Sequence, residues 1–426
     1  MAERIYRDPV HNIIRLDANT EAGNLLVRLV DTAEFQRLRR VRQLGLAAFA
    51  YQGAEHSRFS HSLGVLHLVT RILEKFSRKY QISDFDSVTI RAAALLHDIG
   101  HGAFSHVMES VLGFHHEELT VQAILSAETE VGQVLRSYDF KLPERIAAVI
   151  RGEFKPVALA QLVSSQLDAD RMDYLLRDSL MTGAKYGIFD LEWIIKTLEI
   201  DAEQDRIYVS AHGLFAVEDY LQARYYMFRQ VYFHRTLRSA EVVLRALLGR
   251  ALELFERDEN VWVAPGTAFE KILRRLPLNL REHLELDDTD IMFHIKQWQR
   301  SADTILADLS ARFNNRRLFK ALELDMPEDE RAEFLAEGRK IVERAGLPAQ
   351  YYFVEDRAGD VLYCPSNSPS AKPNSAIYVE DGFSRPAIRE ISEVSTAVLS
   401  LMPGFMAHRV CFPYELLNEI NKIYGK

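Results

Sequence analysis

Histidines concentrate in one part of this chain. Of its 14 histidines, eight lie between His56 and His116. Packing alone explains this density poorly, because a buried imidazole must find hydrogen-bond partners. Neutral imidazole is also the commonest metal ligand near physiological pH. The region is therefore predicted to hold a metal centre. His56, His67 and His115 lack partners at matching spacing and are assigned to ordinary packing.

The centre of the cluster is the segment ALLHDIGHGAFSH at 94–106. His97 and His101 are four residues apart, so on one helix they would project from the same face. Asp98 places a carboxylate directly beside His97. The two glycines of the segment are expected to end the helix and bring His106 toward the same cavity.

Two further segments supply groups for this centre. Upstream, RFSHS places Arg58 three residues before His61, and downstream QLDADRMDYLLRD is rich in carboxylates. One metal ion could be held by His61, His97, Asp98 and a later aspartate. Such a set suits manganese, iron, nickel or zinc, and magnesium in part. Water activated at a metal is a usable nucleophile near neutral pH.

The downstream segment has a helical spacing of its own. Asp170, Tyr174 and Asp178 are four residues apart in turn and would form one stripe along a helix. Such a stripe could bind a metal, a sugar ring and a sugar hydroxyl, although an ordinary polar helix face has the same pattern. Asp173 and Arg177 are interpreted as a structural ion pair, since they too are four residues apart.

Helices are predicted to position these groups. Apolar residues recur at helical spacing in 36–45, 61–80, 87–101 and 166–181, and another long helix is expected from about Val217 to Leu248. A small hairpin is expected near 198–210. Beyond residue 317, short strands are predicted at 351–356, 361–364, 376–381 and 408–413, with helices at 393–402 and 414–425. The fold is thus predicted to be mainly α, with a helical core at 1–317 and a small α+β region at 318–426.

Composition narrows the class of protein. Apolar residues make up 48% of the 426, which excludes a largely disordered chain. The two cysteines, Cys364 and Cys411, have no metal-ligand spacing, so a disulfide framework is not expected and a cytoplasmic location is. No apolar stretch is long enough to span a membrane. The net charge of −9 argues against a general nucleic-acid coat protein. Local clusters of arginine could bind small polyanions or form a solvated basic face.

At this level of detail the chain resembles a known family. RxxHSLG, LLHDIGHGAFSH and LDADRMDYLLRD, in that order, are similar to the motifs of the HD-domain deoxynucleoside triphosphate triphosphohydrolases. That group includes the human sterile-alpha-motif HD-domain enzyme and its bacterial relatives. The resemblance runs from about Tyr6 to Arg238, over half the chain. It implies an HD-domain helical core and hydrolysis of a deoxynucleoside triphosphate to deoxynucleoside and tripolyphosphate.

The resemblance also implies roles for individual residues. The divalent metal would be held by His61, His97, Asp98 and Asp170. Asp98 would also serve in catalysis, with His106 as the leading acid-base group and His101 and His116 as its supporting partners. The residues expected to contact the nucleotide are Gln43, Leu44, Arg58, Arg171, Tyr174, Asp178, Arg224 and Tyr232. Arg171 stands where the human enzyme has a phosphate-binding lysine, which keeps the charge but changes the shape.

The same family has an effector site that reads guanine. Asp31, Gln36 and Arg39 match it here, and a carboxylate, an amide and a guanidinium can together satisfy the edge of guanine. In the family this site lies between subunits, so GTP or dGTP binding and a homo-oligomer, a dimer or a tetramer, are expected. Alternatively, Asp31 is a helix N-cap and Arg39 a surface charge. By the same analogy, the region after residue 317 is expected to help assembly or gate the pocket.

Two other functions remain open. The same metal site could act on another phosphoester, such as a cyclic nucleotide, a guanosine polyphosphate or single-stranded nucleic acid. The negative net charge weighs against a nuclease, which is expected to have a long basic groove. The chain could also be a nucleotide sensor without catalysis, although it keeps every metal ligand of the motif. Neither a membrane nor a nucleic acid is expected as the main partner.

Overall fold

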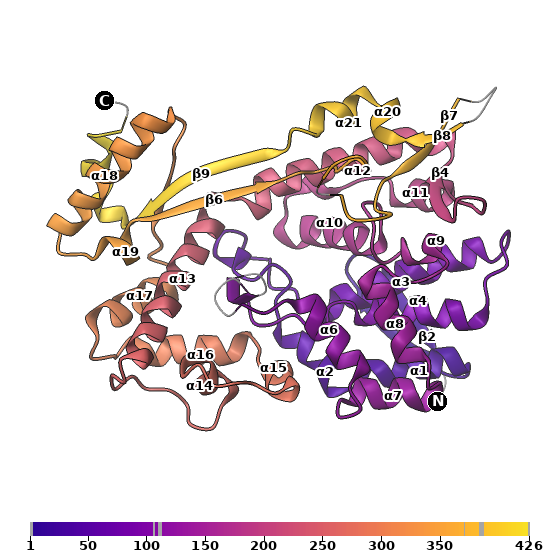
Figure 1. Ribbon diagram of the computed structural model, residues 1–426, viewed down its shortest axis with the longest axis horizontal. Helices are drawn as coiled ribbons and strands as arrows, with labels where there is room; N and C mark the ends of the chain where they lie inside the picture. The colour runs from indigo at the N-terminus through magenta and orange to yellow at the C-terminus, as the bar shows by residue number, and fades with distance from the viewer. Residues whose placement is uncertain (1–2, 105–106, 110–112, 370, 383–386, 425–426) are drawn as a thin grey trace.

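The structure is a computed structural model that describes residues 3–104, 107–109, 113–369, 371–382 and 387–424. Helices dominate it, as predicted (Figure 1). The helices of the first half are α1 (Glu21–Val30), α2 (Ala33–Arg37), α3 (Arg58–Phe76), α4 (Asp84–Leu96), α6 (His116–Leu125), α7 (Glu130–Tyr138), α8 (Leu142–Arg151), α9 (Val157–Ala160), α10 (Ala169–Thr182) and α11 (Leu191–Thr197). Those of the second half are α12 (Leu214–Met227), α13 (Arg235–Glu256), α14 (Ala268–Leu273), α15 (Leu280–Glu285), α16 (Asp288–Trp298), α17 (Thr304–Asn314), α18 (Glu328–Arg344), α19 (Ala349–Tyr352), α20 (Ile391–Val394), α21 (Thr396–Leu401) and α22 (Leu417–Asn421).

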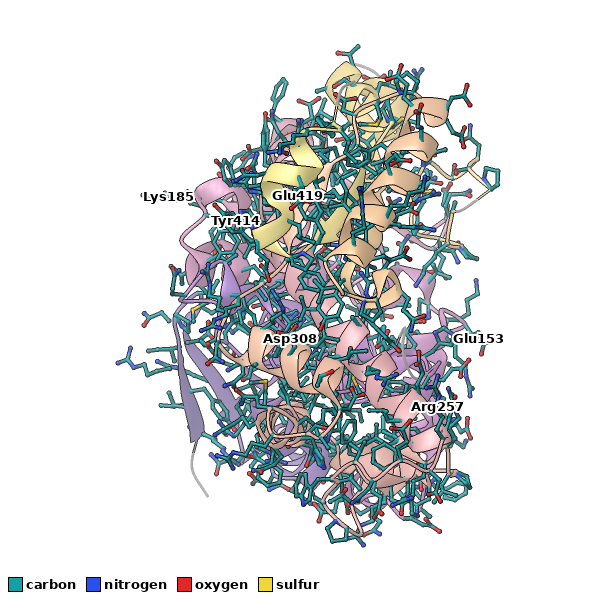
Figure 2. All side chains as sticks on the ribbon, turned by 90° about the vertical axis from the view of Figure 1, so that its left-hand side faces the viewer. Glu153, Lys185, Arg257, Asp308, Tyr414 and Glu419 are labelled. Carbon is teal, nitrogen blue, oxygen red and sulfur yellow. The ribbon has the colours of Figure 1, made fainter. Side chains whose placement is uncertain are left out.

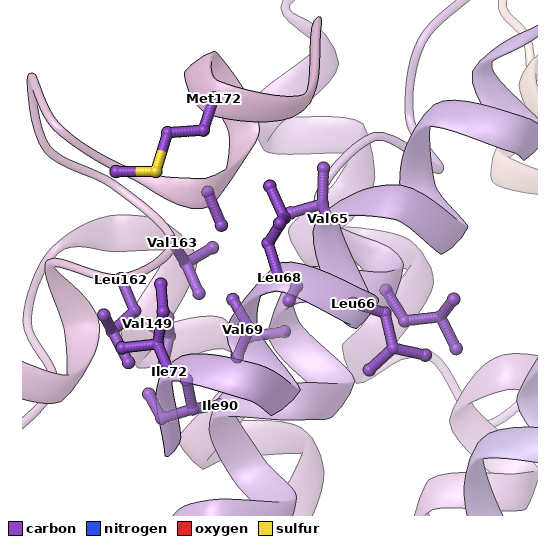
Figure 3. Close-up of a cluster of buried hydrophobic side chains, with 14 of the residues drawn as sticks. Val65, Leu66, Leu68, Val69, Ile72, Ile90, Val149, Leu162, Val163 and Met172 are labelled. Carbon is purple, nitrogen blue, oxygen red and sulfur yellow. The ribbon is translucent and has the colours of Figure 1, made fainter. Parts of the chain in front are cut away.

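Helices α3, α4 and α10 form the centre of the first half. Ser83 caps α4 by accepting from the Asp86 backbone N–H. The apolar face of α3 packs on α4 and α10, and Figure 3 shows the contact. There Val65, Leu68 and Val69 lie among side chains from neighbouring helices, Ile90 included. This packing fixes the three helices that carry the metal-binding motifs.

Small sheets complete the fold. β1 (Glu3–Asp8) and β2 (Asn12–Asp17) pair as an N-terminal hairpin that the sequence reading overlooked. β3 (Leu198–Asp201) and β4 (Arg206–Val209) form a hairpin within 198–210, and β4 runs parallel to β7 (Tyr378–Asp381), which pairs with β8 (Ala387–Glu390). In the third sheet, β9 (Phe405–Phe412) lies between β5 (Lys320–Glu323) and β6 (Val354–Asp360). β6 and β9 make a long ribbon (Figure 1).

Several predicted elements differ from the observed ones. The helix expected from Val217 to Leu248 is interrupted by a π-helical turn, Phe228–Tyr232, and resumes at Arg235. Residues 361–364 are not a strand, because the backbone of Leu362 and Cys364 bonds side chains of the helical core instead of a neighbouring strand. The sequence reading also missed α18 within the C-terminal region.

Two hydrophobic clusters divide the molecule. One gathers buried residues between Ile14 and Val231 and also takes side chains such as Tyr363 and Val379 from the C-terminal region. The other is built around α13, α16 and α17 and includes the end of β9. The C-terminal region thus packs into both clusters, and the division at residue 317 stays a prediction. Figure 2 shows Tyr414 and Glu419 in its upper half and Asp308 below them. No helix among the described residues is long and apolar enough to cross a membrane.

Candidate active site

Three predicted metal ligands meet between α3, α4 and α10. His61 Nε2 lies 3.0 Å from Asp170 Oδ1, and His97 Nε2 lies 3.7 Å from the same oxygen. The ligand atoms of His61, His97 and Asp170 all lie within 4.8 Å of one another. Two imidazole nitrogens and a carboxylate oxygen at this separation suit a divalent first-row metal ion.

His97 is oriented so that one ring nitrogen stays free. α4 ends at Leu96 and His97 is its C-cap, so the expectation that His97 and His101 share one helix face is wrong. His97 Nδ1 donates to the carbonyl of Ala94 at 2.8 Å. Its Nε2 is buried and has no hydrogen-bond partner among the described residues. Buried polar atoms are rarely left unpaired without a reason. The free Nε2 therefore fits the expected divalent metal cofactor.

Asp98 lies beside the three ligands and forms an ion pair with Arg58. Its carboxylate oxygens are 3.4 Å from His97 Nε2 and 3.9 Å from His61 Nε2, and Arg58 Nη1 donates to Oδ2 at 2.5 Å. Burial acts to raise the pKa of Asp98, but the charges of Arg58 and His97 outweigh it and hold the pKa well below its usual value. Asp98 is thus an anionic carboxylate placed to serve as a fourth ligand.

Asp173 supports His61 from behind. Asp173 Oδ2 accepts from His61 Nδ1 at 2.8 Å, and both side chains are fully buried. This bond fixes the ring orientation and leaves Nε2 to face Asp170. Burial acts to lower the pKa of His61, but its hydrogen bonds with Asp170 and Asp173 raise it to about 10. The Gly in HSLG permits this contact, because a Cβ on Gly64 would lie 1.8 Å from Asp173 Oδ1.

The N-terminal hairpin completes the support of Asp173. His11 Nε2 donates to Asp173 Oδ1 at 2.6 Å, and Arg177 bonds Asp173 through Nε at 2.8 Å, which confirms the predicted ion pair. Arg177 Nη1 also reaches Asp8 Oδ2 at 2.8 Å. Asp8, His11 and this role of Asp173 were not predicted from the sequence. The DPVHN turn between two alternating segments was the available signal for the hairpin.

A second group of proton-carrying side chains stands next to Asp98. His101 and His116 stack with ring centres 3.7 Å apart, and His116 Nδ1 lies 2.8 Å from Glu109 Oε1. His101 Nε2 is 3.3 Å from Asp98 Oδ1. Burial, followed by the charge of Arg58, lowers the pKa of His101 to about 4. Glu109 is a residue that the sequence reading missed, and the predicted acid-base group His106 lies outside the described residues.

Arg37, one of four arginines at positions 37, 39, 40 and 42, has a structural role. It is buried, and its guanidinium donates to the carbonyls of Leu286, Ile99 and His101 at 2.6–2.8 Å. These bonds hold the loop after α4 against the second hydrophobic cluster. Arg37 therefore fits neither interpretation of the arginine clusters: it does not bind a polyanion and does not belong to a solvated basic face.

The C-terminal part of α10 carries a second polar cluster. Asp178 accepts from His56 Nε2 at 2.7 Å and from the Tyr232 hydroxyl at 2.8 Å. His56, which was predicted to serve in packing, therefore belongs to this polar cluster. Tyr174 packs edge-on to Tyr232, and burial raises the pKa of its phenol to about 12.

Gln43 and Leu44 come from the segment before α3. The Gln43 backbone N–H donates to His56 at 3.0 Å, while its buried Oε1 has no hydrogen-bond partner among the described residues. Leu44 packs against both hydrophobic clusters. The unpaired oxygen of Gln43 is an acceptor available to a ligand hydroxyl.

Arg171 and Arg224, two of the three arginines expected to contact the nucleotide, have partners within the chain. Arg171 donates to Asp168 and to the Ser165 carbonyl, and the charge of Asp168 keeps the pKa of Arg171 above its usual value in spite of burial. Arg224 donates through Nη1 to the Leu362 carbonyl at 2.6 Å, and its buried Nε lacks a hydrogen-bond partner among the described residues.

The candidate effector residues lie on another face. Asp31 is the C-cap of α1, so its interpretation as an N-cap is wrong; Thr32 precedes α2 instead. Arg4 donates to both oxygens of Asp31 at 2.6 and 2.7 Å. Arg39 Nε donates to Gln36 Oε1 at 2.8 Å, and its guanidinium lies 3.5 Å from the centre of the Phe59 ring. The three residues are thus near the surface, with α2 between Asp31 and Arg39.

Comparisons with known proteins agree with this site. The HD domain family model matches residues 58–178, which contain all four predicted metal ligands. The uncharacterised protein YwfO of Bacillus subtilis is 38% identical over 425 residues, covering 99% of this chain and 94% of its own. The Dictyostelium discoideum homologue of the deoxynucleoside triphosphate triphosphohydrolase SAMHD1 is 28% identical over 259 residues, or 57% of this chain and 48% of that relative.

A solved structure matches nearly the whole fold. The crystal structure of a phosphohydrolase from Bacteroides thetaiotaomicron superposes with a TM-score of 0.82 and 30% identity, covering 96% of this chain and 99% of that one. The similarity therefore extends beyond the matched domain to the C-terminal region.

Proposed function

This chain belongs to the HD-domain family, and on that premise we propose that it is a metal-dependent hydrolase of deoxynucleoside triphosphates. The observation that carries the proposal is the arrangement along α10. Asp170 at the metal cluster and Asp178 in the second polar cluster are eight residues apart, or about 12 Å along a helix. A ligand with phosphates at one end and a sugar hydroxyl at the other fits this spacing.

Unpaired buried atoms support a ligand in this place. Among the described residues, His97 Nε2, Gln43 Oε1 and Arg224 Nε are buried without a hydrogen-bond partner. His97 Nε2 offers a lone pair for a metal ion, Gln43 Oε1 can accept a hydrogen bond from a hydroxyl, and Arg224 Nε can donate one to a phosphate oxygen. A nucleoside triphosphate with its metal satisfies all three at once. The names of the SAMHD1 relatives add support for a deoxynucleotide.

The residues divide the reaction between them. Arg171 and Arg224 bind the β- and γ-phosphates, Arg58 lies by the α-phosphate, and Tyr174 packs by the sugar with Asp178 and Gln43 at its 3′-hydroxyl. A divalent ion held by His61, His97, Asp98 and Asp170 supplies charge neutralisation and activation of water. Water attacks the α-phosphorus, the bond to the 5′-oxygen breaks, and tripolyphosphate is released.

Proton transfer belongs to the histidine group beside Asp98. The 5′-oxygen leaves as an alcohol, so it must gain a proton as its bond to phosphorus breaks. In our proposal His116, held by Glu109 and stacked on His101, moves that proton together with His106.

We also propose that Asp31, Gln36 and Arg39 bind GTP or dGTP and that the chain forms a homo-oligomer. Asp31 is more than half exposed and forms a surface ion pair with Arg4. Surface pairs contribute roughly 0–1 kcal/mol, so a guanine edge can displace this one. GTP should therefore increase turnover and the share of oligomer in wild type, and both effects should be lost in Asp31→Ala. An unchanged response in the variant contradicts this assignment.

One experiment separates the candidate functions. The purified protein, with manganese or magnesium, is incubated with each deoxynucleotide with and without GTP, and the phosphate product is identified. Tripolyphosphate is the expected product. Release of phosphate or pyrophosphate, or turnover only of a cyclic nucleotide, a guanosine polyphosphate or single-stranded nucleic acid, indicates another phosphoesterase. Binding without turnover under any metal indicates a sensor.

A further inference from the structure

The guanidinium of Arg224 is occupied by the C-terminal region. Arg224 projects from α12 and is 7% exposed. Its Nη1 bonds the Leu362 carbonyl, and its Nη2 lies 3.6 Å from Asp360 Oδ2. A phosphate-binding arginine needs its N–H groups for phosphate oxygens. Arg224 therefore has a carboxylate of its own chain within reach of the same N–H groups.

The fold holds Asp360 at this place from both sides. Asp360 is the last residue of β6 and pairs with Phe405 of β9. The turn before β9 lies close to the Asp360 carbonyl, since a Cβ on Gly404 would lie 2.6 Å from that oxygen, and φ there is +72°. On the other side, the Gln166 side chain bonds both the backbone N–H and the carbonyl of Cys364, each at 2.7 Å. The carboxylate is thus presented by a short segment fixed to the helical core.

The charge around Asp360 suits a reversible contact. Its side chain is 31% exposed, whereas the Arg224 side chain is 8% exposed. Burial raises the pKa of Asp360, and the charges of Arg224 and then Arg171 oppose this rise. The carboxylate thus lies within the electrostatic reach of both arginines that we assign to the phosphates. A bound polyphosphate brings like charge to the same place.

We propose that Asp360 competes with phosphate groups for Arg224. It therefore sets how strongly a polyphosphate must bind in order to replace it at that arginine. The proposal rests on the proposed function, in which Arg224 is a phosphate ligand. A polyphosphate that binds Arg224 must replace this carboxylate with its own oxygens. Asp360 therefore lowers the apparent affinity of the site for such an anion.

The test is the affinity of the full-length, metal-loaded protein for inorganic tripolyphosphate and for inorganic phosphate by calorimetry. Asp360→Asn keeps the size of the side chain and removes its charge. We expect it to bind tripolyphosphate about 1.5- to 5-fold more tightly, the range for losing one partly exposed charge contact. Binding of phosphate should improve by no more than the same factor, because the loss of one competitor raises the apparent affinity of every anion that uses Arg224 equally. With a deoxynucleotide, KM should fall while kcat stays within about twofold.

Asp381→Asn is the matched control. Asp381 also lies 3.6 Å from an arginine, Arg389, but on the exposed β7–β8 pair. This variant should bind both anions as wild type does. If Asp360→Asn does not fold, which thermal unfolding will show, Asp360→Ser serves in its place.

Each outcome has one meaning. Equal or weaker tripolyphosphate binding by the Asp360 variant means that the carboxylate orients Arg224 instead of competing for it, and overturns the inference alone. A gain of equal size in Asp381→Asn reduces the effect to net charge and also overturns it. Failure of wild type and variant alike to bind tripolyphosphate overturns both this inference and the proposed function.

Discussion

The metal cluster and the two arginines proposed to bind phosphates, Arg171 and Arg224, are supported in opposite ways. At the cluster, Asp173 and the Ala94 carbonyl accept from the Nδ1 atoms of His61 and His97, and so leave both Nε2 atoms facing the ligand position. At the arginines, Asp168 and the Leu362 carbonyl take N–H groups that a phosphate would also use. The histidines are therefore oriented for metal binding, whereas a phosphate would have to replace existing partners of the arginines.

This difference predicts opposite responses to substitution. Removing a support at the metal cluster should weaken binding, because the ligand geometry is lost. Removing the carboxylate partner of an arginine should strengthen anion binding, as in the Asp360 experiment.

Asp170→Ala removes the oxygen that both histidines face. Turnover should fall by on the order of 10³-fold or more, because the metal loses a ligand and the phosphate loses its charge neutralisation. Kinetics and metal content by mass spectrometry measure the effect. Glu337→Ala, a surface change on α18, is the control and should be neutral. Full activity in the Asp170 variant would show that the cluster is not the catalytic centre.

His116→Gln and Glu109→Gln address proton transfer. Each should lower kcat by about 10²-fold or more, the usual contribution of general acid-base catalysis, while metal affinity stays as in wild type. The pH–rate profile of kcat should lose a limb in His116→Gln. A parallel loss of bound metal would instead place this pair among the metal ligands.

Asp173→Asn removes the anionic support of His61. Metal affinity should fall about 10- to 100-fold, the cost typical of losing an outer hydrogen-bond partner. Manganese titration by electron paramagnetic resonance reads this without turnover. Because Arg177 would keep only Asp8 as a counter-ion, stability should also fall. His11→Gln, which keeps the charge of Asp173, should have the smaller effect on both, and the reverse order would refute this account of the support.

His67 gives a pH dependence on the hairpin side of the cluster. Burial, then the charges of His11 and Arg71, lowers its pKa from 6.5 to about 4. The unfolded imidazole binds a proton at a pH where the folded one does not, so stability should be full above pH 6.5 and decline as pH falls toward 4. Urea unfolding at pH 7 and pH 5 measures the slope. His67→Gln should reduce it, and an unchanged slope would assign it to other groups.

Local patterns predicted much of the site. The spacing of Asp170, Tyr174 and Asp178 predicted one helical stripe, and α10 contains all three. The i,i+4 pair of Asp173 and Arg177 is present as predicted. Motif order gave the HD family, which the comparisons confirm. These features depend on neighbours within a few turns of a helix, where sequence spacing is also spatial spacing.

What failed were inferences that needed distant partners. The end of α4 at Leu96, and with it the separation of His97 from His101, depends on bonds from Arg37 to the carbonyls of the following loop. His56 was read as packing because its partner, Asp178, lies 122 residues away. Residues 361–364 have strand-like composition, but the Gln166 and Arg224 side chains take their backbone groups.

Residue types and helical spacing are enough to identify the chemistry of this protein: imidazoles, carboxylates and arginines, with His61 on α3 and the stripe from Asp170 to Asp178 on α10. Only the tertiary structure decided which atoms of those groups are free. The decisive contacts join distant segments. Asp173 of α10 takes His61 Nδ1 across 112 residues, and the Leu362 carbonyl, just after β6, takes Arg224 Nη1 across 138 residues. Sequence distance carries no information about such contacts, since hydrophobic burial that joins the segments is not directional.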